Sequence, residues 1–183
     1  MTEMLKRDVE YLKASPSELE AYLLSHDIIR QLPDFSFSAG GILLAYKRLE
    51  SASLINEQVE ANWKEIQTIR DHWKTAWATK CHQEYKMRLR QWGDFILGFA
   101  SDKNEPSTAF RHQVRNRVIM HLLDSSNPAI TAEFAESIQR KDKILDKYSV
   151  ENDFVWEKEV QPGFPREDYW YLYRVMRYEK DGK

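Results

Sequence analysis

The fold is decided by the stretch VEANWKEIQTIRDHWKTAWATKCHQEYKMRLRQWGDFILGF, residues 59–99. Its apolar and aromatic side chains recur with a mean spacing of about 3.6 residues, which is the repeat of a straight α-helix. Four of the six tryptophans belong to this row. Its members are Val59, Trp63, Ile66, Ile69, Trp73, Trp77, Cys81, Tyr85, Leu89, Trp92, Ile96 and Phe99. The spacing predicts one long central helix with a continuous buried face.

The length of this helix conflicts with the size of a compact domain. A continuous helix over residues 57–99 would be ~65 Å long, whereas a compact chain of this size has a radius of gyration of ~16 Å. We therefore expect either a break, with Gly93 as the first candidate, or a neighbour along the rod. Because the spacing is looser than the 3.5-residue repeat of a coiled coil, packing by the chain's own helices is favoured over a dimeric zipper.

Further helices are expected on both sides of this row. The chain of 183 residues has only six glycines and six prolines, which favours long elements over a many-stranded barrel or sandwich. Ser15-Pro16 and Asn127-Pro128 each resemble a helix cap followed by proline at the first helical position. The expected flanking helices cover residues 2–13, 16–32, 42–49, 107–123 and 128–148. The predicted fold class is mainly α, a bundle of about six helices around the long central helix.

The C-terminal segment differs in composition from the rest of the chain. Residues 154–178 hold 8 of the 23 aromatic residues. Two interpretations stay open, a short β-hairpin with strands at 154–160 and 169–178, or a final helix capped by Asp168. We expect a helical domain over residues 1–153 and an aromatic cap, residues 154–183, packed on the same domain.

Basic residues are concentrated in the middle of the chain, although the net charge is −2. Residues 80–121 carry 8 basic and 4 acidic groups, whereas residues 1–60 carry 6 basic and 10 acidic groups. The candidate residues for binding an anion or a partner are His82, Lys86, Arg88, Arg90, Arg111, His112, Arg115 and Arg117. The favoured interpretation is internal pairing with the acidic N-terminal region or with Asp142 and Asp146. The alternative is a phosphate-bearing ligand or nucleic acid.

The sequence contains no motif that identifies a catalytic residue, a metal ligand or a cofactor. Histidine pairs with metal-ligand spacing, the Gly-x-Ser-x-Gly elbow and glycine-rich phosphate loops are all missing. The single cysteine, Cys81, lies in the apolar row, where a buried thiol is expected to be inert. Gly40-Gly41 is interpreted as a hinge, with an anion-binding helix start as the alternative. These observations lean away from an enzyme.

The N-terminal residues lack the apolar segment of a signal peptide. No run approaches the ~20 apolar residues of a membrane helix. We therefore expect a cytoplasmic protein without a membrane span.

The aromatic tail has a structural and a functional interpretation. As a latch, its large side chains fix the segment onto the helices; as an adhesive surface, they form a protein interface. The latch is favoured. The candidate interface residues are Trp156, Phe164, Tyr169, Trp170, Tyr171 and Tyr173.

Three functions remain after these exclusions. The first is a non-catalytic interaction or assembly protein with a protein partner or as a homo-oligomer. The second is a nucleic-acid or anionic-ligand binding module that uses residues 80–121. The third is a small enzyme or ligand carrier with a Trp-lined pocket near Arg111, His112, Arg115 or His121.

Overall fold

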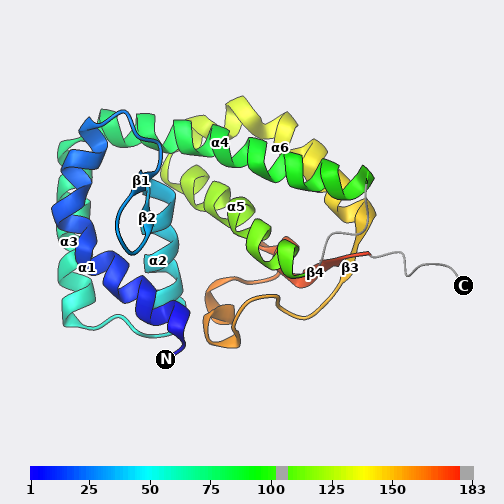
Figure 1. Cartoon of the computed structure of the whole chain (residues 1–183), viewed down its shortest axis with the longest axis horizontal. Coiled ribbons are helices and arrows are strands. Elements are labelled where there is room, and N and C mark those ends of the chain that lie inside the picture. The colour runs from blue at the N-terminus through cyan, green and yellow to red at the C-terminus, as the bar shows by residue number, and fades with distance from the viewer. Residues whose placement is uncertain (102–106, 178–183) are drawn as a thin grey trace, which may run out of the picture.

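The computed structural model describes residues 1–101 and 107–177, which form six α-helices and two short strand pairs (Figure 1). The helices are α1 (Glu3–Leu24), α2 (Ala39–Ser51), α3 (Glu57–His72), α4 (Lys74–Ser101), α5 (Ser107–Ser126) and α6 (Pro128–Tyr148). The mainly α fold class is confirmed. No helix in these two ranges has the length and apolar character needed to cross a bilayer.

The strands and 3-10 helices are short. Antiparallel pairing joins β1 (Arg30–Gln31) to β2 (Ser36–Phe37) and β3 (Ser149–Glu151) to β4 (Arg174–Met176). Two 3-10 helices, η1 (Lys158–Gly163) and η2 (Trp170–Tyr173), lie between β3 and β4. The β1–β2 hairpin therefore connects α1 to α2, and the β3–β4 pair anchors the C-terminal segment beside the end of α6.

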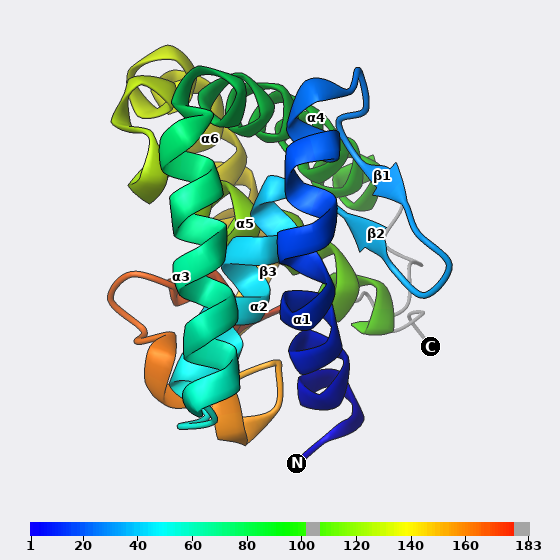
Figure 2. The same cartoon turned by 90° about the vertical axis from the view of Figure 1, so that its left-hand side faces the viewer.

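The helices form two groups joined by the junction of α3 and α4. Figure 1 shows α1, α2 and α3 together at one end of the molecule, with α4, α5 and α6 extending away from them. Figure 2 shows α1 and α3 side by side in front of α2. Because α5 packs against both α4 and α2, it connects the two groups. Fully buried side chains from both groups, including Tyr22, Phe37, Tyr85 and Trp92, belong to one continuous core.

The central row breaks at Trp73, not at Gly93 as expected. Trp73 leaves the helical conformation with φ −105° and ψ 39°, although its N–H still donates to the carbonyl of Ile69 at 2.9 Å. Gly93 lies buried inside α4, where an added Cβ would be 2.5 Å from Cε of Lys141. Glycine is thus placed there to admit a side chain of α6. The break lets α3 pack on α1 while α4 packs on α5 and α6.

The N-terminal region forms one helix where two were expected. α1 continues through Pro16, which lacks the N–H of the regular helical pattern. The preceding hydroxyl, Oγ of Ser15, donates to the carbonyl of Tyr11 at 2.7 Å. Buried leucines on both sides of the proline, Leu12 and Leu19, keep the chain on the same core face. Tertiary packing therefore outweighs the local helix-start signal. The expected end near residue 32 is also wrong, because α1 ends at Leu24.

The short C-terminal strand pair is confirmed, but its strands differ from the expected segments. β3 and β4 cover 149–151 and 174–176, while most of residues 154–173 is irregular or 3-10 helical. Individual aromatic anchors fix this path. Nε1 of Trp156 donates to the carbonyl of Arg111 at 3.2 Å, and the hydroxyl of Tyr173 donates to the backbone carbonyl of Phe164 at 2.8 Å. The division into residues 1–153 and 154–183 stays a prediction, and residues 178–183 lie outside the described part.

Candidate functional site

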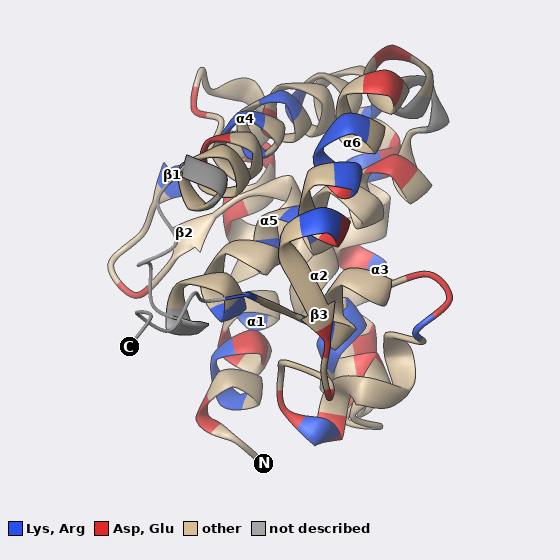
Figure 3. Cartoon of the chain, turned by 90° about the vertical axis from the view of Figure 1, so that its right-hand side faces the viewer, with Lys and Arg blue, Asp and Glu red and all other residues tan. Residues whose placement is uncertain are grey.

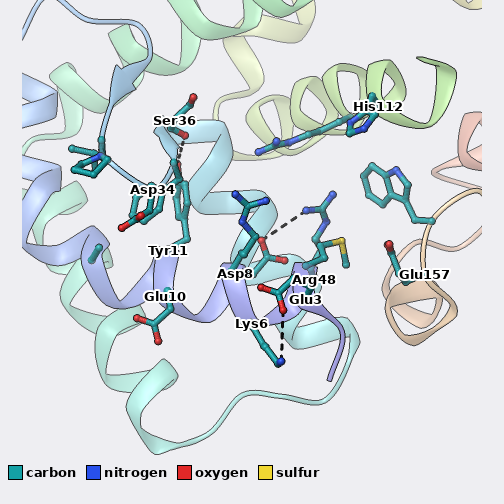
Figure 4. A pocket seen from close by; sticks show the side chains of 18 of the residues that line it. Glu3, Lys6, Asp8, Glu10, Tyr11, Asp34, Ser36, Arg48, His112 and Glu157 are labelled. Carbon is teal, nitrogen blue, oxygen red and sulfur yellow. Dashed lines mark hydrogen bonds and ion pairs between the residues drawn. The ribbon is translucent and has the colours of Figure 1, made fainter. Parts of the chain in front are cut away.

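An open cavity of about 1060 Å³ lies between α1 and α5, and we call it the α1–α5 pocket (Figure 4). The β1–β2 connection borders one end, and Trp156 and Glu157 border the other. Figure 4 shows Asp8 of α1 and Arg48 of α2 pointing toward each other between these ends, with His112 across from them on α5. The pocket thus joins elements that are far apart in the sequence.

The hairpin end of the pocket is held by Tyr11. Its hydroxyl accepts the N–H of Ser38 at 2.9 Å, and its ring lies 4.7 Å from that of Phe35 and 5.6 Å from that of Phe37, centroid to centroid. These contacts attach β2 to the same face of α1 that carries Asp8. One wall of the pocket is therefore a fixed part of the fold.

Asp8 and Arg48 form an incompletely paired charged group at the floor of the pocket. The two residues are only 9% and 8% exposed. Nη1 of Arg48 lies 3.8 Å from Oδ1 of Asp8, which is an ion-pair distance but too long for a hydrogen bond. Oδ2 of Asp8 and Nε of Arg48 are buried without a hydrogen-bond partner. Each such atom costs about 1–3 kcal/mol of stability.

Burial shifts the pKa of both partners toward the neutral form. Desolvation raises the pKa of Asp8 to about 6, even though Arg48 and Arg115 lower it, and Glu157 adds a smaller upward shift. Desolvation likewise lowers the pKa of Arg48 to about 10, against the attraction of Asp8. Titratable groups with such shifts, located in a pocket, are candidates for a functional site.

Arg115 supplies accessible positive charge on the α5 wall of the pocket. Its side chain is exposed to solvent, yet the surrounding concave wall desolvates the guanidinium and, together with the nearby charge of Arg88, lowers its pKa. Among the described residues, no hydrogen bond or ion pair holds this guanidinium. Arg111, one turn earlier, is paired instead with Oε1 of Glu157 at 2.7 Å. Arg115 is therefore available to a ligand, as is Arg7 of α1, which lines the same pocket and is likewise exposed without an ion pair within the described residues.

A buried carboxylate, Glu84, fixes the start of α2 behind the pocket. Its Oε2 accepts the N–H of Gly40 at 2.7 Å, and its Oε1 accepts the hydroxyl of Ser38 at 2.8 Å and Nη2 of Arg88 at 3.0 Å. A Cβ on Gly40 would lie 2.3 Å from Cγ2 of Ile119. Close packing of α5 thus accounts for this glycine, where a hinge was expected. The helix start does bind an anion, but that anion is the chain's own carboxylate.

The structure brings together three of the eight basic candidates, Arg111, His112 and Arg115, which line the α1–α5 pocket. The others are distributed elsewhere: Arg88 is paired with Glu84, Arg117 forms two hydrogen bonds with Asp142 at 3.0 and 3.1 Å, and Nε2 of His82 lies 2.7 Å from Glu133. Lys86 and Arg90 are exposed on α4. The expected internal pairing with Asp142 is present for Arg117.

The six aromatic interface candidates contact their own chain. Five are buried, namely Trp156, Phe164, Tyr169, Tyr171 and Tyr173, and Trp170 is half-buried. These positions agree with the latch interpretation, and a role in a protein interface stays a prediction. One of them, Trp156, also lines the pocket.

Sequence reasoning missed Asp8 and Arg48. The available signal was a charge inside an apolar row: Asp8 lies between Leu5 and Leu12 on the buried face of α1. Such a charge is rarely buried without a reason. Its partner on α2 is 40 positions away, so the sequence alone does not connect the two.

Within residues 1–101 and 107–177, no three His, Cys, Asp or Glu side chains gather closely enough to hold a metal ion. Comparisons with protein-family models, with curated proteins and with solved structures give no significant match to this chain. The functional argument therefore depends on the geometry of the pocket.

Proposed function

We propose that this chain binds a small anionic ligand, a molecule with a carboxylate or phosphate group, in the α1–α5 pocket. The observation that carries the proposal is the unpaired, solvent-accessible guanidinium of Arg115 inside a concave site that already desolvates it. Arginine presents a planar set of donors that matches carboxylate and phosphate oxygens. An anion at this position would offset the repulsion between Arg115 and Arg88.

The dimensions and walls of the pocket support a ligand of metabolite size. Its volume of about 1060 Å³ is near the upper end of the usual range for small-molecule sites. Apolar side chains such as Met4, Phe35 and Trp156 line it together with the charged groups. Eleven of the twenty lining residues are charged, which suits a charged ligand better than an apolar one.

The distribution of charge favours a small anion over nucleic acid. Acidic and basic residues alternate along α1 and α6 in Figure 3, whereas a nucleic-acid site usually presents a continuous basic face. Arg88 and Arg117, which the sequence placed in the basic region, are paired with carboxylates of the chain. The interaction or assembly function also stays a prediction, and the burial of most candidate aromatics gives it no added support.

The test is a calorimetric titration with inorganic phosphate, succinate, glutarate, L-aspartate and L-glutamate. We expect Arg115→Ala to weaken binding of the best anion by about tenfold, since a charge-assisted hydrogen bond is lost. Arg90→Ala is the matched control, because Arg90 is an exposed arginine on α4 that does not line the pocket. The proposal is wrong if none of these anions binds, or if both variants weaken binding equally.

A further inference from the structure

The acidic group at the floor of the α1–α5 pocket is not needed for binding an anion. Asp8 faces Arg48 without a hydrogen bond, and its buried Oδ2 has no partner. An ionised carboxylate would repel an anion bound at Arg115, since both residues line the same pocket. A purely anionic ligand would therefore leave this oxygen of Asp8 without a partner.

A ligand with a donor next to its anionic group would satisfy both residues. An ammonium group has three N–H donors and a positive charge, which would pair with the Asp8 carboxylate while the anion accepts from Arg115. The nearby cations, Arg48 and Arg115, and the nearby anion, Glu157, come from three different elements of the wall. Charges of both signs thus meet in one cavity.

We propose that the pocket binds a zwitterionic ligand, in which an amino group contacts Asp8 and a carboxylate or phosphate contacts Arg115. This inference rests on the proposed function and narrows it to one chemical class. Asp8 is then the residue that determines specificity, and Arg115 is the residue that supplies affinity for any anion.

The competing arrangement has a protonated Asp8 that donates to the anion itself. The two arrangements differ in the direction of proton transfer. An amino group stabilises the ionised carboxylate, so binding near pH 6 releases a proton from Asp8, whereas a donating Asp8 takes up a proton on binding. His112 lines the same pocket, so the measurement is repeated in a His112→Gln background.

The experiment compares two pairs of ligands that differ only in an amino group, L-aspartate with succinate and L-glutamate with glutarate. We expect the amino-bearing member to bind about tenfold more tightly to the wild-type chain. Asp8→Asn should abolish this preference, whereas Asp34→Asn should retain it, because Asp34 is an exposed carboxylate at the hairpin end of the pocket and not at its floor. Titration at pH 6 in two buffers of different ionisation enthalpy should show proton release for L-glutamate, lost in Asp8→Asn.

The two proposals fail in different ways. Equal binding within each pair, tighter binding of succinate and glutarate, or proton uptake would overturn the zwitterionic ligand while leaving an anion site in place. Absence of binding for all four compounds and for inorganic phosphate would overturn both proposals. The wild-type chain alone decides between the two arrangements, through its preference for the amino-bearing ligand and the direction of proton transfer at pH 6. The test therefore holds even if a variant fails to fold.

Discussion

Arg48 lies over the indole of Trp156, with its Cζ 4.6 Å from the ring centroid. This contact joins α2 to the segment before η1 and holds the guanidinium beside Asp8. Nε1 of the same indole donates to the carbonyl of Arg111 on α5. One tryptophan therefore connects three parts of the pocket wall.

Replacing this tryptophan should be costly. We expect Trp156→Ala to lower the free energy of unfolding by about 3–5 kcal/mol, since a buried aromatic, a cation–π contact and a hydrogen bond are lost together. Urea denaturation measures the change. Trp170→Ala is the control, because removing this half-buried tryptophan should lower the free energy of unfolding by less than half as much. Equal losses in the two variants would contradict the anchoring role of Trp156.

Asp8→Asn should stabilise the protein at neutral pH. The pKa of Asp8 rises from 3.8 in an ordinary setting to about 6 in the folded chain. A raised pKa in the folded state means that the folded state binds the proton more tightly than the unfolded state does. Protonation of Asp8 therefore stabilises the fold fully below pH 4, and this stabilisation is lost as the pH rises through 6. We expect the free energy of unfolding of the variant to exceed that of the wild type by on the order of 1–3 kcal/mol above pH 7, and the two to be nearly equal at pH 4. A stability difference that does not change with pH would show that Asp8 does not titrate in this way.

Gly40→Ala should be strongly destabilising. The new Cβ would lie 2.3 Å from Cγ2 of Ile119 and 2.8 Å from Oε1 of Glu84, so α2 or α5 must move. We expect a loss of about 3 kcal/mol, at the upper end of the usual cost of overpacking. Thermal unfolding would test this, and a melting temperature equal to that of the wild type would contradict the close packing.

Gly93→Ala should be tolerated much better. Here the new Cβ meets Cε of Lys141, the far part of a flexible side chain, at 2.5 Å. The gain of about 1 kcal/mol in helix propensity then offsets most of the cost of moving the lysine. The stability of the variant should stay within about 1 kcal/mol of the wild type, and its helical circular dichroism should not change. A loss of helix signal would indicate that the glycine has a further role in α4.

The Glu84–Arg88 pair should behave as a coupled unit. We expect Glu84→Gln and Arg88→Met each to cost about 3 kcal/mol, because each leaves a charge without its partner. The double variant should cost clearly less than the sum of the two. A double-mutant cycle in urea measures this coupling; additive losses would show that Glu84 acts mainly on Gly40 and Ser38.

The helical periodicity of residues 59–99 was readable from the sequence because it reflects local geometry. Nine of the twelve row members are buried, and the other three, Trp63, Ile69 and Trp73, are half-buried. The position of the break was not readable, since Trp73 fits the row as well as its neighbours do. The turn there satisfies the packing of α3 on α1 and of α4 on α5, which are contacts between distant parts of the chain.

The sequence by itself determined the helical class, the start of α6 at Asn127-Pro128 and the burial of Cys81, because spacing, capping and hydrophobicity act over a few residues. Only the tertiary structure decided that α1 continues through Pro16 and that the tail closes as a β3–β4 pair. It also decided the α1–α5 pocket, because Asp8, Arg48 and Arg115 come from three helices. Their proximity, and the burial that shifts their pKa values, exist only after these helices pack.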